Sequence, residues 1–135
     1  MSTRLALVTI LVQDMPRAKA FYTDLLGFEV IQDFSSPAGD FLFLHSRASE
    51  TNIALQDATR TTFGVPLVHG GIMLGFAFED ADAVYREWQS KPVEILGEVG
   101  DMDAGRMFPA RDPDGNYIQV YHLSPQVRDM QQRMG

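Results

Sequence analysis

A strand-then-helix pattern occurs twice in this chain, and the repeat limits the possible folds more than any other feature. The apolar run 5–12 (LALVTILV) precedes residues 13–28 (QDMPRAKAFYTDLLGF), where apolar residues recur at helical spacing. The apolar run 71–78 (GIMLGFAF) precedes residues 79–90 (EDADAVYREWQS) in the same way. Asp14 and Asp80 are suitable N-caps and lie 66 residues apart. The sequence therefore predicts two equivalent modules.

Three strand candidates follow each predicted helix. They are residues 28–34, 40–45 and 52–56 in the first module, and residues 93–99, 106–110 and 116–123 in the second. The segment DPDG at 112–115 is a turn between the last two strands, and we interpret its two carboxylates as turn chemistry, not as a catalytic pair. Each module thus has the order βαβββ, which predicts an α+β fold.

The modules are expected to form a single domain over residues 1–123. The first module spans about residues 4–56, the second about 71–123, and 57–70 is interpreted as a linker. The tail 124–135 can form a short helix with Ser124 as its N-cap.

Composition excludes several classes of protein and site. The formal net charge of -7 disfavours nucleic acid as a partner, because phosphate binding needs clustered Lys and Arg. The absence of cysteine excludes disulfides, thiolate zinc sites and cysteine nucleophiles. The apolar run 5–12 is too short to span a bilayer and lacks the features of a signal peptide. We therefore expect a cytoplasmic protein with no membrane partner.

Two segments carry a family resemblance. VQDMPRAKAFYTDLLGF (12–28) and GRMFPARDPDGNYIQV (105–120) resemble the two signatures of the vicinal oxygen chelate superfamily. That superfamily includes glyoxalase I, bleomycin resistance proteins, extradiol dioxygenases and fosfomycin resistance enzymes. The resemblance implies that each module curls a mixed sheet into a half-open cup, that the two cups enclose a cleft, and that the protein is a homodimer. It does not identify the activity, because the family supports very different reactions on one frame.

The resemblance also implies where a metal would be held. Metal-using members carry His, Glu or Gln on the first and last strands of each module, where these donors converge on one divalent ion. The corresponding residues here are Leu7, Met73 or Leu74, Ala54 or Gln56, and Gln119 in the place of the usual Glu. Apolar and thioether side chains do not suit such an ion. We therefore predict no metal and no cofactor.

Alternation along the strands predicts an apolar, aromatic pocket instead. Because residues two apart on a strand share a face, Gln119 is expected to lie beside Tyr117 and Tyr121. The expected ligand-binding residues are Leu7, Thr9, Phe43, Leu74, Phe76, Arg106, Tyr117, Gln119 and Tyr121. The alternative is that these side chains only fill the space between modules or subunits.

Four further side chains have more than one interpretation. Arg106 could clamp an anionic group of a ligand, or it could pair with a nearby carboxylate, Asp101 or Asp103, at the surface. His122 has the strand phase opposite to Gln119. His45 is expected to end its strand, with a place at the cleft rim as the alternative, and His69 is expected to lie in a loop, with a place at the cleft mouth as the alternative.

Three functions remain open. The first is a metal-free protein similar to bleomycin resistance proteins, which binds a small organic ligand, an antibiotic or an aromatic metabolite, in the apolar cleft. The second is a metal-dependent lyase or dioxygenase of the same superfamily. The third is an isomerase or hydrolase that works without metal, with His45, His69 or a tyrosine as general acid or base. We favour the first, and the sequence leaves open whether the chain is an enzyme.

Overall fold

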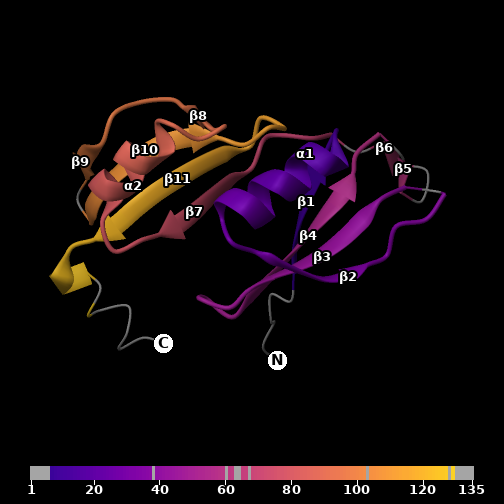
Figure 1. Cartoon of the computed structure of the whole chain (residues 1–135), viewed down its shortest axis with the longest axis horizontal. Helices are drawn as coiled ribbons and strands as arrows, with labels where there is room; N and C mark the ends of the chain where they lie inside the picture. The colour runs from indigo at the N-terminus through magenta and orange to yellow at the C-terminus, as the bar shows by residue number, and fades with distance from the viewer. Residues whose placement is uncertain are drawn as a thin grey trace. The chain divides into compact units, whose positions relative to one another are not determined.

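The structure of the chain is a computed structural model that describes residues 7–37, 39–59, 61–62, 65–66, 68–102, 104–127 and 129. The chain divides into two compact units. The first comprises Met1–Gly70 with Pro113–Gly115, and the second comprises Gly71–Asp112 with Asn116–Gly135. Each unit contains a main mixed sheet and a helical segment, as labelled in Figure 1. The predicted α+β fold class is confirmed.

The first unit opens with strand β1 (Val8–Val12) and helix α1 (Met15–Ala20). As predicted, Asp14 caps α1, because its carboxylate accepts a hydrogen bond of 3.2 Å from the Arg17 N–H. The helix continues as a π-helical turn, η1 (Phe21–Leu25), where the sequence predicts regular α-helix. Within this turn the Thr23 hydroxyl donates to the Lys19 carbonyl at 2.7 Å, a contact that disturbs regular helix geometry.

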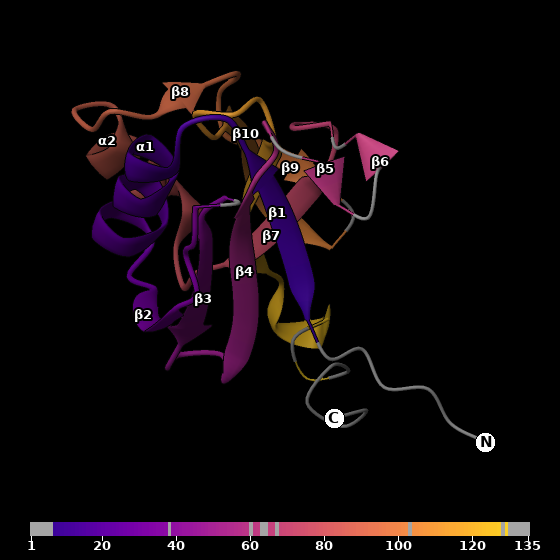
Figure 2. The ribbon, with the colours of Figure 1, turned by 90° about the vertical axis from the view of Figure 1, so that its right-hand side faces the viewer.

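The sheet of the first unit has the strand order β1-β4-β3-β2. Its other strands are β2 (Glu29–Asp33), β3 (Phe41–Ser46) and β4 (Thr51–Asp57), close to the predicted positions. β1 runs parallel to β4, and the other pairs are antiparallel. One face of the sheet packs against the helical segment, as Figure 2 shows, and the core there contains Ile10, Val12, Phe21, Tyr22, Leu42, Leu44 and Leu55.

The second unit repeats this arrangement with the strand order β7-β11-β10-β8. Its elements are β7 (Met73–Ala77), α2 (Ala81–Trp88), β8 (Glu94–Ile95), β9 (Gly100–Met102), β10 (Gly105–Arg111) and β11 (Tyr117–Leu123). Asp80 caps α2 by accepting a 3.1 Å hydrogen bond from the Ala83 N–H, as predicted. Trp88 of α2 packs edge-on against Phe108 of β10 at 5.8 Å, and both side chains are buried.

One predicted strand is much shorter than expected. Instead of covering residues 93–99, the strand is limited to β8, and β9 pairs separately with β10. The cause lies in β10, where Pro109 would be the next residue to pair with β8. Its carbonyl accepts from the Leu96 N–H at 2.9 Å, but proline has no N–H to return the bond, so the ladder stops.

Two segments outside the main sheets have local structure. The predicted linker contains the short strands β5 (Thr61–Thr62) and β6 (Val65–Pro66), which pair with each other. In the tail, residues 125–127 are helical, and the Ser124 hydroxyl accepts from the Val127 N–H at 3.5 Å. The last residues of the tail lie outside the described residues. Among the described helices, none is long and apolar enough to cross a membrane.

Candidate functional site

The register of the second sheet decides which predicted site residues share a face. Ile118 and Val120 are buried on the side that packs against α2, together with Phe108 and Ala110. We call the opposite side the distal face of the second unit. Its described residues include Met73, Gly75, Ala77, Glu94, Gly100, Gly105, Met107, Pro109, Arg111, Tyr117, Gln119, Tyr121 and Leu123.

The centre of this distal face is aromatic and polar. A Cβ atom at Gly75 would lie 3.2 Å from Cε1 of Tyr121 and 3.9 Å from Oε1 of Gln119, so both side chains reach over β7 at a place kept open by glycine. Tyr117 is 43% exposed, although tyrosine rings usually bury most of their area. The grouping of Tyr117, Gln119 and Tyr121 on one face agrees with the predicted alternation.

Arg111 also lies on this face, although it was not among the ligand-binding residues expected from the sequence. It pairs with Tyr117 across the hairpin, and its guanidinium carbon lies 5.2 Å from the centre of the Tyr117 ring. Nη1 is 3.8 Å from a carboxylate oxygen of Glu94, and the buried Nε has no hydrogen-bond partner among the described residues. Counting outward from the predicted 112–115 turn would pair residue 111 with 116, whereas the observed register pairs it with 117, so the predicted turn alone did not signal this contact.

Two expected site residues, Leu74 and Phe76, lie on the side of the sheet opposite to Gln119. Leu74 pairs with Ile118 and Phe76 pairs with Val120, so both point toward the helix side, where they are half-buried. The expectation that they line the same surface as Gln119 is wrong. The physical reason is that β7 is apolar at nearly every position, so alternation alone cannot assign its phase.

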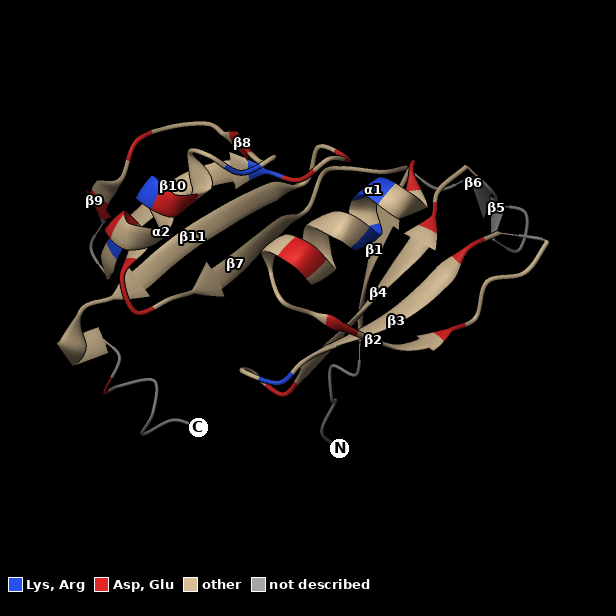
Figure 3. Cartoon of the chain, viewed as in Figure 1, with Lys and Arg blue, Asp and Glu red and all other residues tan. Residues whose placement is uncertain are grey.

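Arg106 lies on the helix side as well, because it pairs with His122 across β10 and β11. Its Nε and Nη2 donate to the two carboxylate oxygens of Asp82 at 2.9 Å each, and Nη1 donates to Asp101 at 2.7 Å. The charged residues meet where α2 and β10 are adjacent in Figure 3. The predicted surface pairing with Asp101 is present, and Arg106 does not share the face of Gln119 on which the pocket was expected. Asp103 lies outside the described residues.

This ion pair affects the titration of its members. The hydrogen bond from Arg106 lowers the pKa of Asp82 below its ordinary value, and the charge of Arg106 adds to the effect. The hydrogen bonds to Asp82 and Asp101 raise the pKa of Arg106 in turn. Arg106 is thus fully engaged by carboxylates of its own unit.

The first unit also has a face opposite its helix, which we call the distal face of the first unit. Thr9, Ala54 and Phe43 pair side by side across β1, β4 and β3, and alternation adds Leu7. The register therefore places Thr9 and Phe43 on one face, as predicted, whereas Leu7 precedes β1 and is placed there by alternation alone. His45 lies on this face within β3, where its Nδ1 contacts Oδ1 of Asn52 at 2.7 Å.

The residues at the family's metal-ligand positions do not fit a divalent ion. Ala54 pairs with Thr9 as Gln119 pairs with Gly75, so Ala54, not Gln56, is the counterpart of Gln119. The first strands offer Leu7 and Met73. In the part of the chain that the structure describes, no group of three or more His, Cys, Asp or Glu residues is placed to hold a metal. A single amide oxygen among apolar side chains is a poor ligand set.

Two histidines and the turn carboxylates make structural contacts. His122 accepts through Nδ1 a 2.8 Å hydrogen bond from the Ala81 N–H at the start of α2. His69 Nδ1 lies 3.1 Å from the Asp114 carbonyl. Asp112 accepts from the backbone and side chain of Asn116, in agreement with the predicted turn chemistry. Asp114 also accepts from the Gln13 N–H at 2.6 Å within the first unit.

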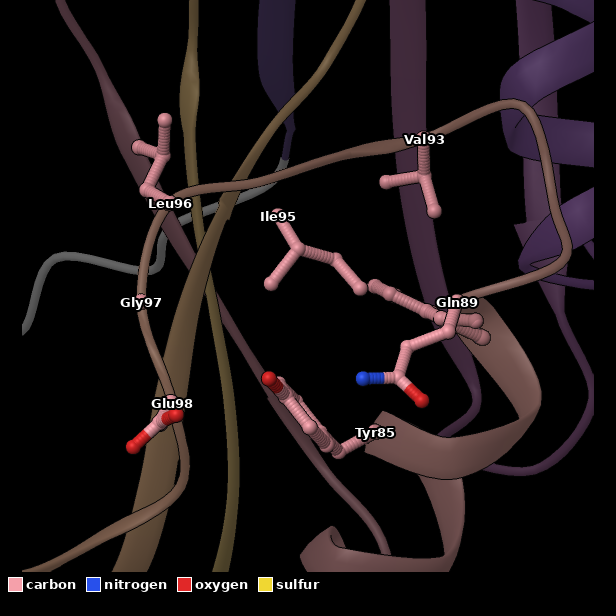
Figure 4. Close-up of a pocket in the computed structure, with 8 residues that line it drawn as sticks. Tyr85, Gln89, Val93, Ile95, Leu96, Gly97 and Glu98 are labelled. Atoms are coloured by element: carbon pink, nitrogen blue, oxygen red, sulfur yellow. The ribbon is translucent and has the colours of Figure 1, made fainter.

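A hollow of about 390 Å³ lies on the helix side of the second unit. Figure 4 shows Tyr85 of α2 and Gln89, which follows the helix, opposite Val93 and Ile95, and the chain at Leu96, Gly97 and Glu98 borders the hollow. None of the predicted ligand-binding residues lines this hollow. Its walls come from a helix and an irregular segment, so no motif or periodicity in the sequence could have predicted it.

Comparison with known proteins gives a consistent family assignment. Residues 4–120 match the model of the Glyoxalase/Bleomycin resistance protein/Dioxygenase superfamily. The uncharacterized protein YetH from Bacillus subtilis (strain 168) is 27% identical over 117 residues, which cover 86% of this chain and 95% of YetH.

Two solved structures illustrate the range of similar proteins. TnmS3, an antibiotic binding protein from Streptomyces sp. CB03234, is 27% identical with a TM-score of 0.72, covering 91% of this chain and 98% of TnmS3. Leishmania major glyoxalase I has a TM-score of 0.71 at 24% identity, covering 98% of this chain and 96% of that protein. The second likeness shows the fold alone.

Proposed function

We propose that this chain, which belongs to the Glyoxalase/Bleomycin resistance protein/Dioxygenase superfamily, binds a small aromatic molecule on the distal face of its second unit. The observation that carries the proposal is the row of Tyr117, Gln119 and Tyr121, which occupies the last strand where a metal-using relative carries a ligand. The protein is then a binding protein similar in role to the antibiotic-binding relative TnmS3.

The chemistry of the row supports this role. Tyrosine rings offer a large contact area and lose little entropy when they are fixed. The Gln119 carboxamide can both donate and accept, so it can orient a bound carbonyl or hydroxyl group. On the distal face of the first unit, we keep Leu7, Thr9 and Phe43 as separate candidate ligand contacts. We expect a homodimer as well, which light scattering can measure.

A thermal-shift screen tests the proposal. The wild-type chain is screened against antibiotics and aromatic metabolites, and a ligand of the native state raises the midpoint of unfolding. A stabilising compound should lose most of its effect on Tyr117→Ala, which truncates an exposed ring, and keep it on Gln89→Ala, which alters the hollow beside α2. If Gln89→Ala abolishes stabilisation and Tyr117→Ala does not, the ligand site lies in the hollow and the proposal is wrong.

A further inference from the structure

We propose that Arg111 binds an anionic group of the ligand, so that the second unit's distal face selects aromatic acids, meaning carboxylates or ionised phenols. The inference rests on the proposed function and adds the chemical class of the ligand. Arg111 is the last residue of β10, and it shares the distal face with Tyr117 and Gln119.

The position of the guanidinium suits a ligand lying on the tyrosine row. Its carbon lies 5.2 Å from the centre of the Tyr117 ring, and the side chain is 35% exposed. Stacking on a ring holds the planar group in place while its edge stays available to a carboxylate. Gln119 follows Tyr117 by two residues on the same face, about 6–7 Å further along the strand. An aromatic ring can bridge that distance with its charged group at Arg111.

The hydrogen bonds of the two arginines of β10 differ sharply. Arg106 donates three hydrogen bonds of 2.7 to 2.9 Å to two carboxylates. Arg111 donates none to the described residues, because its nearest carboxylate oxygen, on Glu94, lies 3.8 Å away and its buried Nε has no partner. A half-buried guanidinium with five donors and no hydrogen bond is rare, since such donors are normally satisfied. An anionic ligand would satisfy them.

Few charged residues lie on this face, so the affinity for an anionic ligand should depend mainly on one residue. β7 and β11 carry no Lys, Arg, Asp or Glu, as Figure 3 shows, so of these four residue types only Arg111 and Glu94 are placed on the distal face among the described residues. The net charge of -7 repels an anion at long range, but screening limits that repulsion to about 8–10 Å in physiological salt. Affinity for an anion should therefore depend strongly on Arg111, and Glu94 should oppose it.

The test uses two probes of the same shape, 2-naphthoate and its neutral methyl ester. Their dissociation constants are measured by NMR titration for the wild type, Arg111→Gln, Arg111→Lys, Glu94→Gln and the control Arg47→Gln. Arg47 is also paired with a glutamate, but it lies in the other unit and is 81% exposed. Thermal unfolding and light scattering are recorded for each variant to follow folding and subunit assembly.

The expected result is a charge-specific loss. Arg111→Gln should raise the dissociation constant of 2-naphthoate about tenfold, as expected for the loss of a charge-assisted hydrogen bond. The dissociation constant of the ester should change less than twofold. The affinity of Arg111→Lys for 2-naphthoate should lie between those of the wild type and Arg111→Gln, because lysine keeps the charge but loses the bidentate geometry of the guanidinium. Glu94→Gln should tighten 2-naphthoate a few-fold by removing the competing carboxylate, and Arg47→Gln should change neither probe. If Arg111→Gln does not fold, the other two variants test the inference. Arg111→Lys should weaken the binding of 2-naphthoate, and Glu94→Gln should strengthen it.

Other outcomes overturn the inference in distinguishable ways. An equal loss for both probes, or no loss for either, means that Arg111 does not recognise charge. A wild type that binds the ester but not 2-naphthoate refutes the anionic class while the proposed function stands. Failure of both probes to bind at millimolar concentration refutes both proposals. A change in subunit assembly in Arg111→Gln assigns this residue to a contact between copies instead.

Discussion

The two units share a strand order and an Asp-capped helix but present different distal faces. On the helix side both sheets bury aliphatic and aromatic residues, represented by Leu44 in the first unit and Phe108 in the second. On the distal side the first unit places Thr9 beside Ala54, whereas the second places Gln119 beside Gly75 and a guanidinium above Tyr117. The helix side is constrained by the need to form a core, so the distal side is where repeated modules can diverge in function.

The largest effect should come from the side that the units have in common. Phe108→Ala, at a side chain with no exposed area, should lower the free energy of unfolding by about 3–5 kcal/mol, and Leu44→Ala by about 2–5 kcal/mol. On the distal side, Tyr117→Ala should cost about 1 kcal/mol or less, because the ring is 43% exposed. Urea denaturation measures the free energy of unfolding for all three variants. A larger loss for Tyr117→Ala than for Phe108→Ala would contradict the assignment of the core to the helix side.

A smaller effect should follow from closing the space over β7. In Gly75→Ala the new methyl group would meet the Tyr121 ring at 3.2 Å, so the ring must move by a few tenths of an ångström. We expect ligand affinity to fall about threefold, since a contact at the site is displaced, while stability changes by less than about 1 kcal/mol. Gly100→Ala is the matched control, because nothing lies within 4 Å of its added Cβ. Unchanged affinity in Gly75→Ala would place the ligand away from Tyr121.

A weaker effect, dependent on pH, is expected at the ion pair on the helix side. Because the pKa of Asp82 is lowered in the folded chain, the pair stabilises the protein above the ordinary carboxyl pKa of 3.8 and loses this contribution as the pH falls through the folded value. Arg106→Gln should therefore lower the melting temperature slightly near neutral pH, and the difference from wild type should shrink below pH 3.8. A difference that grows on acidification would contradict the assigned sign.

The smallest effect should be that of metal ions. After incubation with Ni, Zn, Mn or Fe(II), elemental analysis should find no stoichiometric metal, because Leu7, Met73 and Ala54 stand where donors are needed. The melting temperature should not change either. One bound equivalent with micromolar affinity would show that other residues supply the ligands, and would revive the metal-dependent lyase or dioxygenase as a function.

Local signals in the sequence were sufficient for the starts of the two helices and for the 112–115 turn. The caps at Asp14 and Asp80 and the turn at 112–115 depend on residues close in sequence, so each could be predicted from its own segment. The phase of β11 followed from alternation along that strand, whereas the phase of β10 did not, because Arg106 was expected beside Gln119 and Arg111 was overlooked.

Pairing over longer distances could not be predicted in the same way. β7 is apolar on both faces, so only its register with β11 shows that Leu74 and Phe76 face the helix. The early end of β8 depends on Pro109 in a neighbouring strand. The pairing of Arg106 with Asp82 joins a strand to a helix 24 residues away in the chain, whereas the carboxylates expected to pair with it, Asp101 and Asp103, are close in sequence.

The location of the ligand is the central claim, and NMR mapping tests it most directly. The 135-residue chain is small enough for assigned amide spectra, and a compound found in the thermal-shift screen is titrated into the labelled protein. The largest shift changes should fall on residues 117–121 and on Gly75 and Arg111, with small changes at residues 93–98. Changes concentrated at Tyr85, Gln89 and residues 93–98 would place the ligand in the hollow beside α2 and contradict the account.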